Sequence, residues 1–466
     1  MIFNMAKILV IEHYFLTPHF ETGVELAIEN KMKSNNVLYI YLKQFYPTLL
    51  VPYHLKLSFI KNIQYLKKRE SSIKKNLFRI KKRFDITFEF ISNKNILIFF
   101  KALKYSIFHP LSIEKISVYR YNNVNLGISA LSTYISNIGD DQPNIKFSLI
   151  RLKKILFESV IAFELTQNLI VKHKPDLVYV FNGRFNVDNA IVKSCQLNGV
   201  EIILHERGCN FHKYEVFEWP LHSFYNINKQ INEYYLKKTI TNIEYHNIAN
   251  SFFQQNRNGK DLHWLSFNSN FKKTNIKRTN KIRYVYFSSS DDEFSHIEFL
   301  KEDKQPLFTN QRECIKYLIQ YFSFQKDREL IIRVHPHKNK KAIELKNFWN
   351  NLSGENITVI KSYSDIDSYQ LIEESDVVLS YGTTVGIEST YWGKPSILLG
   401  SSYYMFLNCT FNPQNIEELN ELLHTSNKLN AFPVESTYKF GYYMMTFGKK
   451  FNYYKPKNFF EGELIL

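Results

Sequence analysis

The chain of 466 residues is poor in glycine and proline, with 15 and 13 of them. With 44% hydrophobic and 22% charged residues, its composition is that of a globular protein and argues against a disordered or collagenous one. Cysteine is rare too. The four cysteines form no C-x-x-C pair and match no zinc spacing: Cys195, Cys209, Cys314 and Cys409. We therefore expect buried thiols in a reducing compartment, not a disulfide scaffold.

Long apolar runs are also missing. No stretch approaches the roughly 18 uncharged apolar residues of a membrane-spanning helix, and Ile8–Ile11 is too short for the core of a signal peptide. We expect a cytoplasmic protein, either free or at the inner face of the cytoplasmic membrane. Acidic residues are in deficit, 44 against 60 basic, which gives a net charge of +16. This excess favours anionic partners, namely nucleotides, acidic glycans, phospholipid surfaces or nucleic acid, without choosing among them.

Apolar runs alternate with helical patterns in two series. In the first half, strands are predicted at 7–12, 37–42, 176–181 and 200–204. In the second half they are predicted at 284–287, 329–334, 357–360, 376–380 and 395–399. A polar stretch at 268–280 separates the two series. This pattern predicts an α/β fold with two Rossmann-like, doubly wound domains that face a cleft.

The expected domains are residues 1–267 and 281–425, followed by an aromatic-rich segment, 426–466, that either packs back on the first domain or forms an interface. Residues 56–83 hold eleven basic residues against one acidic residue, with apolar residues at mostly helical spacing. They predict one or two basic amphipathic helices within a helical insertion at about 55–150. The insertion is either a solvated hairpin or a surface for anionic lipid or glycan. For 84–150 we expect mixed strand and loop.

Polar residues follow most of the predicted strands, where ligands bind in open parallel sheets. In the second domain, Gly382-Thr-Thr-Val-Gly386 is either a phosphate-binding turn or a tight turn with Thr384 as helix cap. It matches neither a Walker A loop nor G-x-G-x-x-G. Glu388 either accepts hydrogen bonds from a ribose or complements the helix dipole. The predicted donor-binding residues are Ser288, Ser289, Arg333, His335, Gly382, Thr383, Thr384 and Glu388.

In the first domain, His205-Glu-Arg-Gly208 holds an acid and a cation in one loop. Glu206 is the predicted general base, and His335 is the second predicted catalytic residue, donating to the leaving phosphate. Asn182, Arg184 and Arg207 are the predicted acceptor-binding residues. A Glu206–Arg207 ion pair and a simple Asn-Gly turn are the alternatives. We expect no metal, because Asp365 and Asp367 fit helix capping and residues 291–293 fit a helix start.

The loops 333–336, 382–388 and 393–395, with 182–185 and 205–208, resemble the bacterial capsule polysaccharide biosynthesis family, which includes Kdo-transferring enzymes of the GT-B type. The resemblance implies a nucleotide sugar bound mainly by the second domain and a lipid-linked glycan acceptor. It implies that His335 contacts the donor phosphate and that Thr383 and Thr384 are the hydroxyl pair of enzymes that use CMP-sugars. Glu388 resembles the acid of the Gly-rich helix. The first domain contains no acidic motif like the one that would supply the catalytic base in this family. We therefore assign Glu206 as the base on chemical grounds, with Glu12 and Asp291 as substitutes.

The expected function is that of a metal-independent glycosyltransferase without a cofactor. It would move a sugar, from a CMP-sugar by preference, to a growing surface polysaccharide. The expected partners are this donor, an anionic or lipid-linked acceptor, and anionic membrane through 56–83, but not nucleic acid. The alternatives are a CDP-polyol phosphotransferase, a sugar-nucleotide epimerase, and a non-catalytic glycan- or nucleotide-binding assembly protein.

Overall fold

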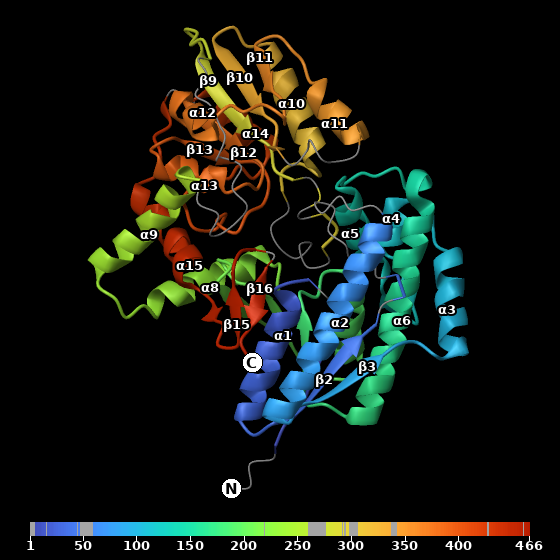
Figure 1. Ribbon diagram of the computed structural model, residues 1–466. Helices are drawn as coiled ribbons and strands as arrows, with labels where there is room; N and C mark the ends of the chain where they lie inside the picture. Colours follow the sequence, from blue (N-terminus) through green and yellow to red (C-terminus); the bar gives the residue numbers. More distant parts are fainter. Residues whose placement is uncertain are drawn as a thin grey trace.

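The computed structural model describes residues 5–14, 16–43, 45–46, 59–218, 220–259, 276–290, 292, 295–297, 306–336, 343–425, 428–459 and 461–466. These residues form two α/β domains, each built around its own sheet, and the second domain lies above the first in Figure 1.

The first sheet has the strand order β14-β8-β7-β6-β1-β2-β3. Its five parallel strands are β1 (Lys7–Glu12), β2 (Asn36–Leu42), β3 (Thr87–Ile91), β6 (Leu177–Phe181) and β7 (Glu201–Arg207). Two antiparallel strands extend it, β8 (Lys213–Phe217) and β14 (Lys449–Lys450). This is the Rossmann order, and the chain changes direction across the sheet between β1 and β6. Ligands bind at such a point.

Helices cover both faces of this sheet. One face carries α1 (His19–Met32) and α2 (Phe59–Phe84), which share a core with β1 and β2. The other face carries α3 (Ile96–Ile107), α5 (Gly127–Ile138), α6 (Leu149–His173) and α7 (Asn186–Leu197). Short elements connect them: α4 (Ile113–Ser117), β4 (Arg120–Tyr121), β5 (Val124–Asn125) and the 3-10 helix η3 (Ile145–Ser148). With both faces covered, the parallel strands are continuous apolar runs.

The basic segment forms a single amphipathic helix, which was one of the predicted alternatives, but it is not an inserted hairpin. This helix, α2, connects the neighbouring strands β2 and β3 and buries Ile73, Leu77 and Ile80 against the sheet. Residues 84–150 are mainly helical and not mixed strand and loop. Residues 56–58 of the basic segment lie outside the described residues. Helical spacing indicated the amphipathic helix but could not show that its apolar face closes a βαβ unit.

The second sheet has the order β11-β10-β9-β12-β13, and all its pairs are parallel. Its strands are β9 (Ile282–Phe287), β10 (Arg328–Arg333), β11 (Ile357–Ile360), β12 (Val377–Ser380) and β13 (Ser396–Leu398). One face packs α10 (Gln311–Ser323), α11 (Ile343–Asn350) and α14 (Ile416–His424), and the other packs α12 (Ser368–Glu374). The predicted class, α/β and GT-B-like with two Rossmann-like domains, is confirmed.

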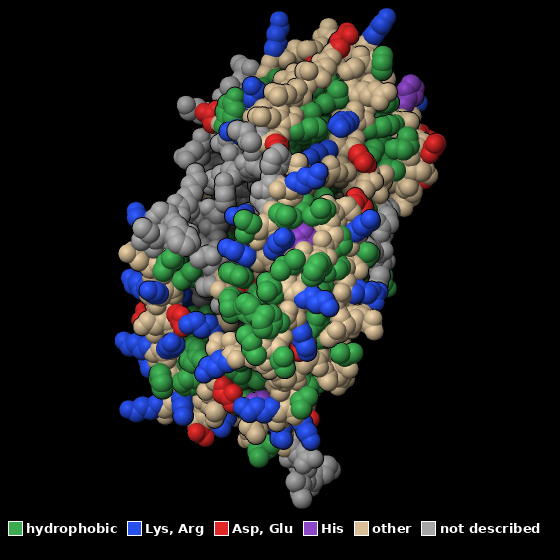
Figure 2. All heavy atoms as spheres, turned by 90° about the vertical axis from the view of Figure 1, so that its right-hand side faces the viewer, with side chains coloured by type: hydrophobic (Ala, Val, Ile, Leu, Met, Phe, Trp, Pro, Cys, Tyr) green, Lys and Arg blue, Asp and Glu red, His purple; other side chains and the backbone are tan. Residues whose placement is uncertain are grey.

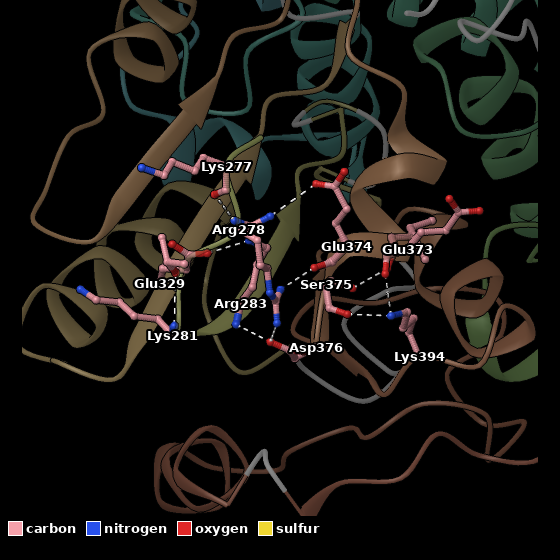
Figure 3. A network of polar contacts seen from close by, with 12 residues as sticks. Lys277, Arg278, Lys281, Arg283, Glu329, Glu373, Glu374, Ser375, Asp376 and Lys394 are labelled. Atoms are coloured by element: carbon pink, nitrogen blue, oxygen red, sulfur yellow. Dashed lines mark hydrogen bonds and ion pairs between the residues drawn. The ribbon is translucent and has the colours of Figure 1, made fainter. Parts of the chain in front are cut away.

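A network of charged side chains ties the amino ends of the second sheet together (Figure 3). Arg283 of β9 is 1% exposed, and its Nε donates to Glu329 of β10 at 2.6 Å. The backbone N–H of Arg283 donates to Asp376, just before β12, at 2.7 Å. Arg278 donates to the same carboxylate at 2.6 Å. These charges therefore lie at the edge of the sheet opposite to the one where ligands bind.

Three helices join the domains. α8 (Phe224–Leu236) and α9 (Asn242–Arg257) follow β8, yet α9 packs with α15 (Tyr438–Thr446) and with α13 (Val385–Tyr391) of the second domain. After the 3-10 helix η7 (Val434–Thr437) and α15, the chain returns to the first sheet through β14. The hairpin β15 (Tyr454–Pro456) and β16 (Gly462–Leu464) packs on the first domain (Figure 1). The predicted boundary at 267 falls within residues 260–275, which lie outside the described residues, and the predicted start of the second domain at 281 falls directly before β9.

All four cysteines are buried, as expected, and none of the four forms a disulfide. Within the described ranges, no helix has both the length and the apolar character needed to span a bilayer.

Candidate functional site

The carboxyl ends of the two sheets face each other, and Arg184 connects them. This residue lies in the loop between β6 and α7. Its Nη2 donates to the backbone oxygen of Asp292, in the segment after β9, at 2.8 Å. Its Nε donates to Ser132 of α5 at 2.8 Å. Arg184 therefore joins the strand-end loops of both domains, whereas the sequence predicted an acceptor-binding side chain.

Glu206 lies at the end of β7 beside the turn after β6. Its carboxylate accepts hydrogen bonds from the side-chain amide of Asn182 and from the backbone N–H of Arg207, the latter at 2.8 Å. His19 of α1 lies 3.8 Å from the same carboxylate. Burial raises the pKa of Glu206, although these hydrogen bonds and the charge of Arg207 oppose the rise. A carboxylate with a raised pKa is suited to accept a proton near neutral pH.

A buried group of histidines and carboxylates lies next to Glu206, in the interior of the domain where β1, β6 and β7 end. His13 Nε2 donates to Asp188 of α7, and His205 Nε2 lies 3.4 Å from Glu12. The Glu12 carboxylate also accepts the backbone N–H groups of His13 and Tyr14, at 3.1 and 2.9 Å. This group fixes the loop after β1 against α7 and β7.

Charges in this group perturb one another. Burial opposes a charge on His13, but the carboxylates of Asp188, Glu12 and Glu158 outweigh it and raise its pKa. Burial raises the pKa of Asp188, against the opposing effect of His13. The pKa of His19 lies well below its ordinary value because of burial and the charges of Arg207, His205 and His13. Strongly shifted pKa values at a strand-end site are typical of functional sites.

Of the carboxylates in this site, Glu206 is the one that solvent reaches. The side chains of Glu12 and Asp188 are 0% exposed, whereas that of Glu206 is 25% exposed. Glu12 was predicted as a substitute base, and its burial leaves no access for an acceptor hydroxyl. Asp291, the other substitute, lies outside the described residues.

Asn182 and Arg207 flank Glu206, as their predicted role requires, but both make internal contacts. Asn182 Oδ1 accepts from the backbone N–H of Arg184 at 3.0 Å and from His222 at 3.3 Å. Arg207 Nη2 donates to the backbone oxygen of Phe459 at 3.0 Å, and its guanidinium lies over the ring of Phe459. The C-terminal segment therefore lies against the predicted acceptor loop. Acceptor binding by these residues stays a prediction.

In the second domain, β9, β10 and β12 bring three predicted loops side by side. The backbone N–H of His335 donates to Ser288 Oγ at 2.7 Å. Ser289 is held by Gln311 at the start of α10, which accepts its N–H at 2.9 Å. Ser380 of β12 pairs with Phe287 of β9 in parallel, so Tyr381 and Gly382 leave β12 beside Ser288 and Ser289. The structure brings Ser288, Ser289, His335 and the Gly-Thr-Thr loop together at one sheet edge.

Glycine is needed at two positions of the Gly-Thr-Thr loop. Gly382 has φ +81°, and a Cβ there would lie 2.7 Å from the backbone oxygen of Ser401. A Cβ at Gly386 would lie within 3 Å of the hydroxyls of Tyr404 and Ser380. Both glycines therefore serve the tight strand-to-helix turn. Thr384 stands at the N-cap position of α13, as one of the two alternatives had it, but its side chain caps no backbone N–H and instead hydrogen-bonds Glu388.

Two predicted donor residues are buried inside the second domain. Arg333 is 2% exposed and donates to the backbone oxygens of Lys361 and Ser364 at 2.9 and 3.1 Å. Glu388 is 4% exposed and accepts from the hydroxyl of Tyr369. Burial raises the pKa of Glu388, although hydrogen bonds from Tyr369, Thr384 and Asn256 of α9 oppose the rise. These contacts make Arg333 an anchor of the loop after β11 and Glu388 a link between α9, α12 and α13.

Of the acidic residues at 365–367 and 291–293, Asp367 is the one whose bonds in the described part of the chain cap a helix. Asp367 Oδ1 accepts from the N–H of Tyr369 at the start of α12 at 2.9 Å, as predicted. Asp292 accepts from the hydroxyl of Ser290 at 2.7 Å, while residues 291 and 293 lie outside the described residues. Within the described part of the chain, no group of three or more His, Cys, Asp and Glu side chains is arranged to hold a metal ion.

Sequence reasoning missed His19, Asp188 and Gln311. Each lies in the first turn of the helix that follows β1, β6 or β9. The strand-end rule was applied to the loops alone, and extending it by one helical turn would have found all three.

No protein-family profile matches the sequence, and a search of curated proteins finds no match. Among solved structures, the chain is similar to KpsC of Thermosulfurimonas dismutans, a β-Kdo 2,4-transferase, at 12% identity and a TM-score of 0.38, over 57% of this chain and 78% of that one. It is similar to S. aureus MnaA in complex with UDP at 12% identity and a TM-score of 0.30, over 96% and 94%. For CalG4, the calicheamicin glycosyltransferase, the identity is 9% and the TM-score 0.30, over 95% and 94%. Similarities of this size assign no activity to the chain.

Proposed function

We propose that the protein is a glycosyltransferase that moves a sugar from a nucleotide-sugar donor to an acceptor hydroxyl on a growing surface polysaccharide. One observation carries the proposal. Two Rossmann-type sheets face each other with their ligand-binding edges, and Arg184 joins the loops between them. The first edge presents a partly exposed acid, Glu206, and the second presents three partly exposed residues, Thr383, Thr384 and His335. With the acid on one domain and the phosphate-binding groups on the other, the site suits a reaction in which a nucleotide-linked group is transferred to a second substrate.

In the proposed reaction, the donor phosphates lie against His335 and the Thr383–Thr384 turn, and the acceptor enters from the first domain. The predicted donor residue Ser288 is 2% exposed, and its hydroxyl instead holds the backbone N–H of His335. Glu206 takes the proton of the acceptor hydroxyl as the oxygen forms its bond to the anomeric carbon. The bond between that carbon and the phosphate oxygen breaks, and the nucleotide leaves as an anion that His335 stabilises. Arg333 and Glu388 act indirectly in this scheme, by holding the loops that bind the donor.

A CMP-sugar is the donor we favour, because of the Thr383–Thr384 pair. The first test is the thermal stabilisation of the protein by CMP, CDP, UDP, GDP and ADP, each with and without magnesium. A ligand at 100 times its dissociation constant stabilises a protein by about 2.7 kcal/mol. A selective shift by CMP that does not need magnesium supports the proposal. A preference for UDP or GDP retains a transferase with another donor, and no shift with any nucleotide contradicts the proposal.

A second test addresses the chemistry. His335→Ala removes the imidazole but keeps the backbone N–H that donates to Ser288. We expect a folded protein that still binds nucleotide but has lost most turnover, about 100-fold or more. Wild-type turnover in His335→Ala would remove the histidine from the mechanism.

The CDP-polyol phosphotransferase stays the second candidate, because the same hydroxyl and histidine loops suit a pyrophosphate. The product separates the two reactions: a glycosyltransferase forms a glycosidic bond, and a phosphotransferase forms a phosphodiester that phosphodiesterase treatment cleaves.

A further inference from the structure

The outer side of α3 exposes large apolar side chains in a row. Ile98, Ala102 and Tyr105 of this helix are buried against α6, whereas the opposite side presents apolar residues to solvent. The exposed members are Leu97 (68%), Phe100 (57%), Ile107 (47%) and Phe108 (71%), with Ile96 (62%) at the start of the helix, and Leu111 (60%) is exposed in the connection to α4. Their spacing places them on one face, and contiguous apolar patches of this kind mark interaction sites.

Lysines are interspersed in this apolar row. Lys101 and Lys104 lie on the same side of α3, Lys94 is exposed just before this helix, and Lys115 is exposed on the next helix, α4. Among the acidic residues nearby, Glu164 pairs with Lys101 at 3.2 Å, and Glu114 is exposed. Apolar residues combined with lysines are typical of surfaces that insert into the headgroup region of a membrane, where lysine stems lie along the apolar layer and their charges reach the phosphates.

The basic helix α2 lies beside the same edge of the first sheet. β3 is the edge strand, with α2 packed on one face of the sheet and α3 on the other. The cations of α2 that point to solvent are Lys61, Lys67, Lys68, Lys74, Lys75, Arg79, Lys81, Lys82 and Arg83. Figure 2 faces this side of the molecule and shows hydrophobic side chains gathered among lysines and arginines. The cations of α2 therefore supply long-range attraction to an anionic surface next to the apolar row of α3.

We propose that the first domain docks on an anionic phospholipid bilayer through α3, with Leu97, Phe100, Ile107 and Phe108 in the headgroup region and Lys101 and Lys104 on lipid phosphates. This assigns the contact to α3, whereas the sequence pointed to the basic segment 56–83. A second copy of the chain fits the surface less well, because a twofold contact would bring the lysines of both copies together in an apolar interface. The proposal does not depend on the proposed reaction.

The experiment is co-sedimentation of the full chain with vesicles of phosphatidylcholine, with and without about 30 mol % phosphatidylglycerol. We expect binding to the anionic vesicles that weakens with added salt. The double variant Phe100→Ser/Phe108→Ser should need about tenfold more lipid for half-maximal binding, since two apolar side chains no longer insert. Lys101→Glu/Lys104→Glu should lose the preference for anionic vesicles.

Matched controls come from the second domain. Phe324 is 81% exposed, and Lys326 is exposed two residues later, so Phe324→Ser and Lys326→Glu remove the same chemistry from another surface. Both controls should bind vesicles like the wild type, and the melting temperature of every variant shows that it folds. Wild-type affinity in the α3 variants, or no binding of the wild type to anionic vesicles at low salt, overturns the proposal. A wild-type dimer that the α3 variants convert to monomers, without vesicle binding, assigns the surface to a second copy instead.

Discussion

At the scale of single residues, exposure separates Glu206 from the buried acids around it. Glu206→Gln keeps the size of the side chain but removes its basicity, so we expect turnover to fall by about 100- to 10,000-fold. Because burial raises the pKa of Glu206, the wild-type rate should fall on acidification at a higher pH than an ordinary glutamate would give. A pH–rate profile measures this. Glu201→Gln, at the exposed start of the same strand, is the control and should behave like the wild type.

A second residue-scale prediction concerns the stability of the first domain. Glu158 of α6 is 3% exposed, and its carboxylate accepts the backbone N–H of Tyr46. Burial raises its pKa from 4.5 to about 7, despite the opposing hydrogen bonds. The folded state therefore holds this proton more tightly than the unfolded state. The resulting stability is complete below pH 4.5 and is lost as the pH rises through about 7, by roughly 3 kcal/mol.

Glu158→Gln removes this titration and keeps an oxygen for the N–H of Tyr46. We expect its melting temperature to exceed that of the wild type at pH 8 by several degrees, with a smaller difference at pH 5. Glu233→Gln, at a half-exposed site on α8, should show no such pH dependence. An equal difference at both pH values would contradict the assigned titration of Glu158.

At the scale of elements, the network around Arg283 holds the amino ends of β9, β10 and β12 together (Figure 3). Arg283→Leu leaves the Glu329 carboxylate without this buried partner, so we expect the second domain to lose about 3–5 kcal/mol of stability. Because the network lies at the edge opposite to the site, nucleotide affinity at low temperature should not change. Chemical denaturation and nucleotide titration measure the two quantities.

The control for Arg283 is Arg278→Ala. Arg278 binds the same Asp376 carboxylate, but its side chain is 48% exposed, so its loss should cost about 1 kcal/mol or less. A similar cost for both variants would mean that burial of the arginine does not determine the strength of the network.

At the scale of the whole molecule, two arginines hold the domains to each other. Arg184 donates to the backbone of Asp292, and Arg312 of α10 pairs with Asp140 and Asp141, beyond the end of α5. The double variant Arg184→Ala/Arg312→Ala should keep the nucleotide affinity of the second domain but lose turnover. Without these contacts, the ligand-binding edges of the two sheets are no longer held at the distance and orientation that the reaction needs. Small-angle scattering should show a larger radius of gyration. Arg151→Ala, at an exposed position of α6, should change neither quantity.

The strand-end rule, applied to the sequence, correctly placed Asn182, Glu206, Ser288 and His335 at sheet edges, because carboxyl ends of parallel strands share an edge. It could not show that Arg184 crosses to the other domain, since no local pattern encodes a contact over 108 residues. The rule also could not show that Arg333 is buried and not accessible to a ligand. A position at a strand end predicts at which edge of the sheet a residue lies, but its burial depends on what packs against it, which for Arg333 is the loop that follows β11.

The sequence by itself determined the strands, most of the helices and the α/β class, because apolar periodicity and capping act within a few residues. It also determined that the chain is basic and that eleven of its 60 basic residues cluster at 56–83. Tertiary structure alone decided that the basic helix closes a βαβ unit, that His13 meets Asp188 over 175 residues, and that α3 carries the exposed apolar row. These outcomes depend on which strands pair and which faces are covered, and the free energy of those contacts comes from residues far apart in the chain.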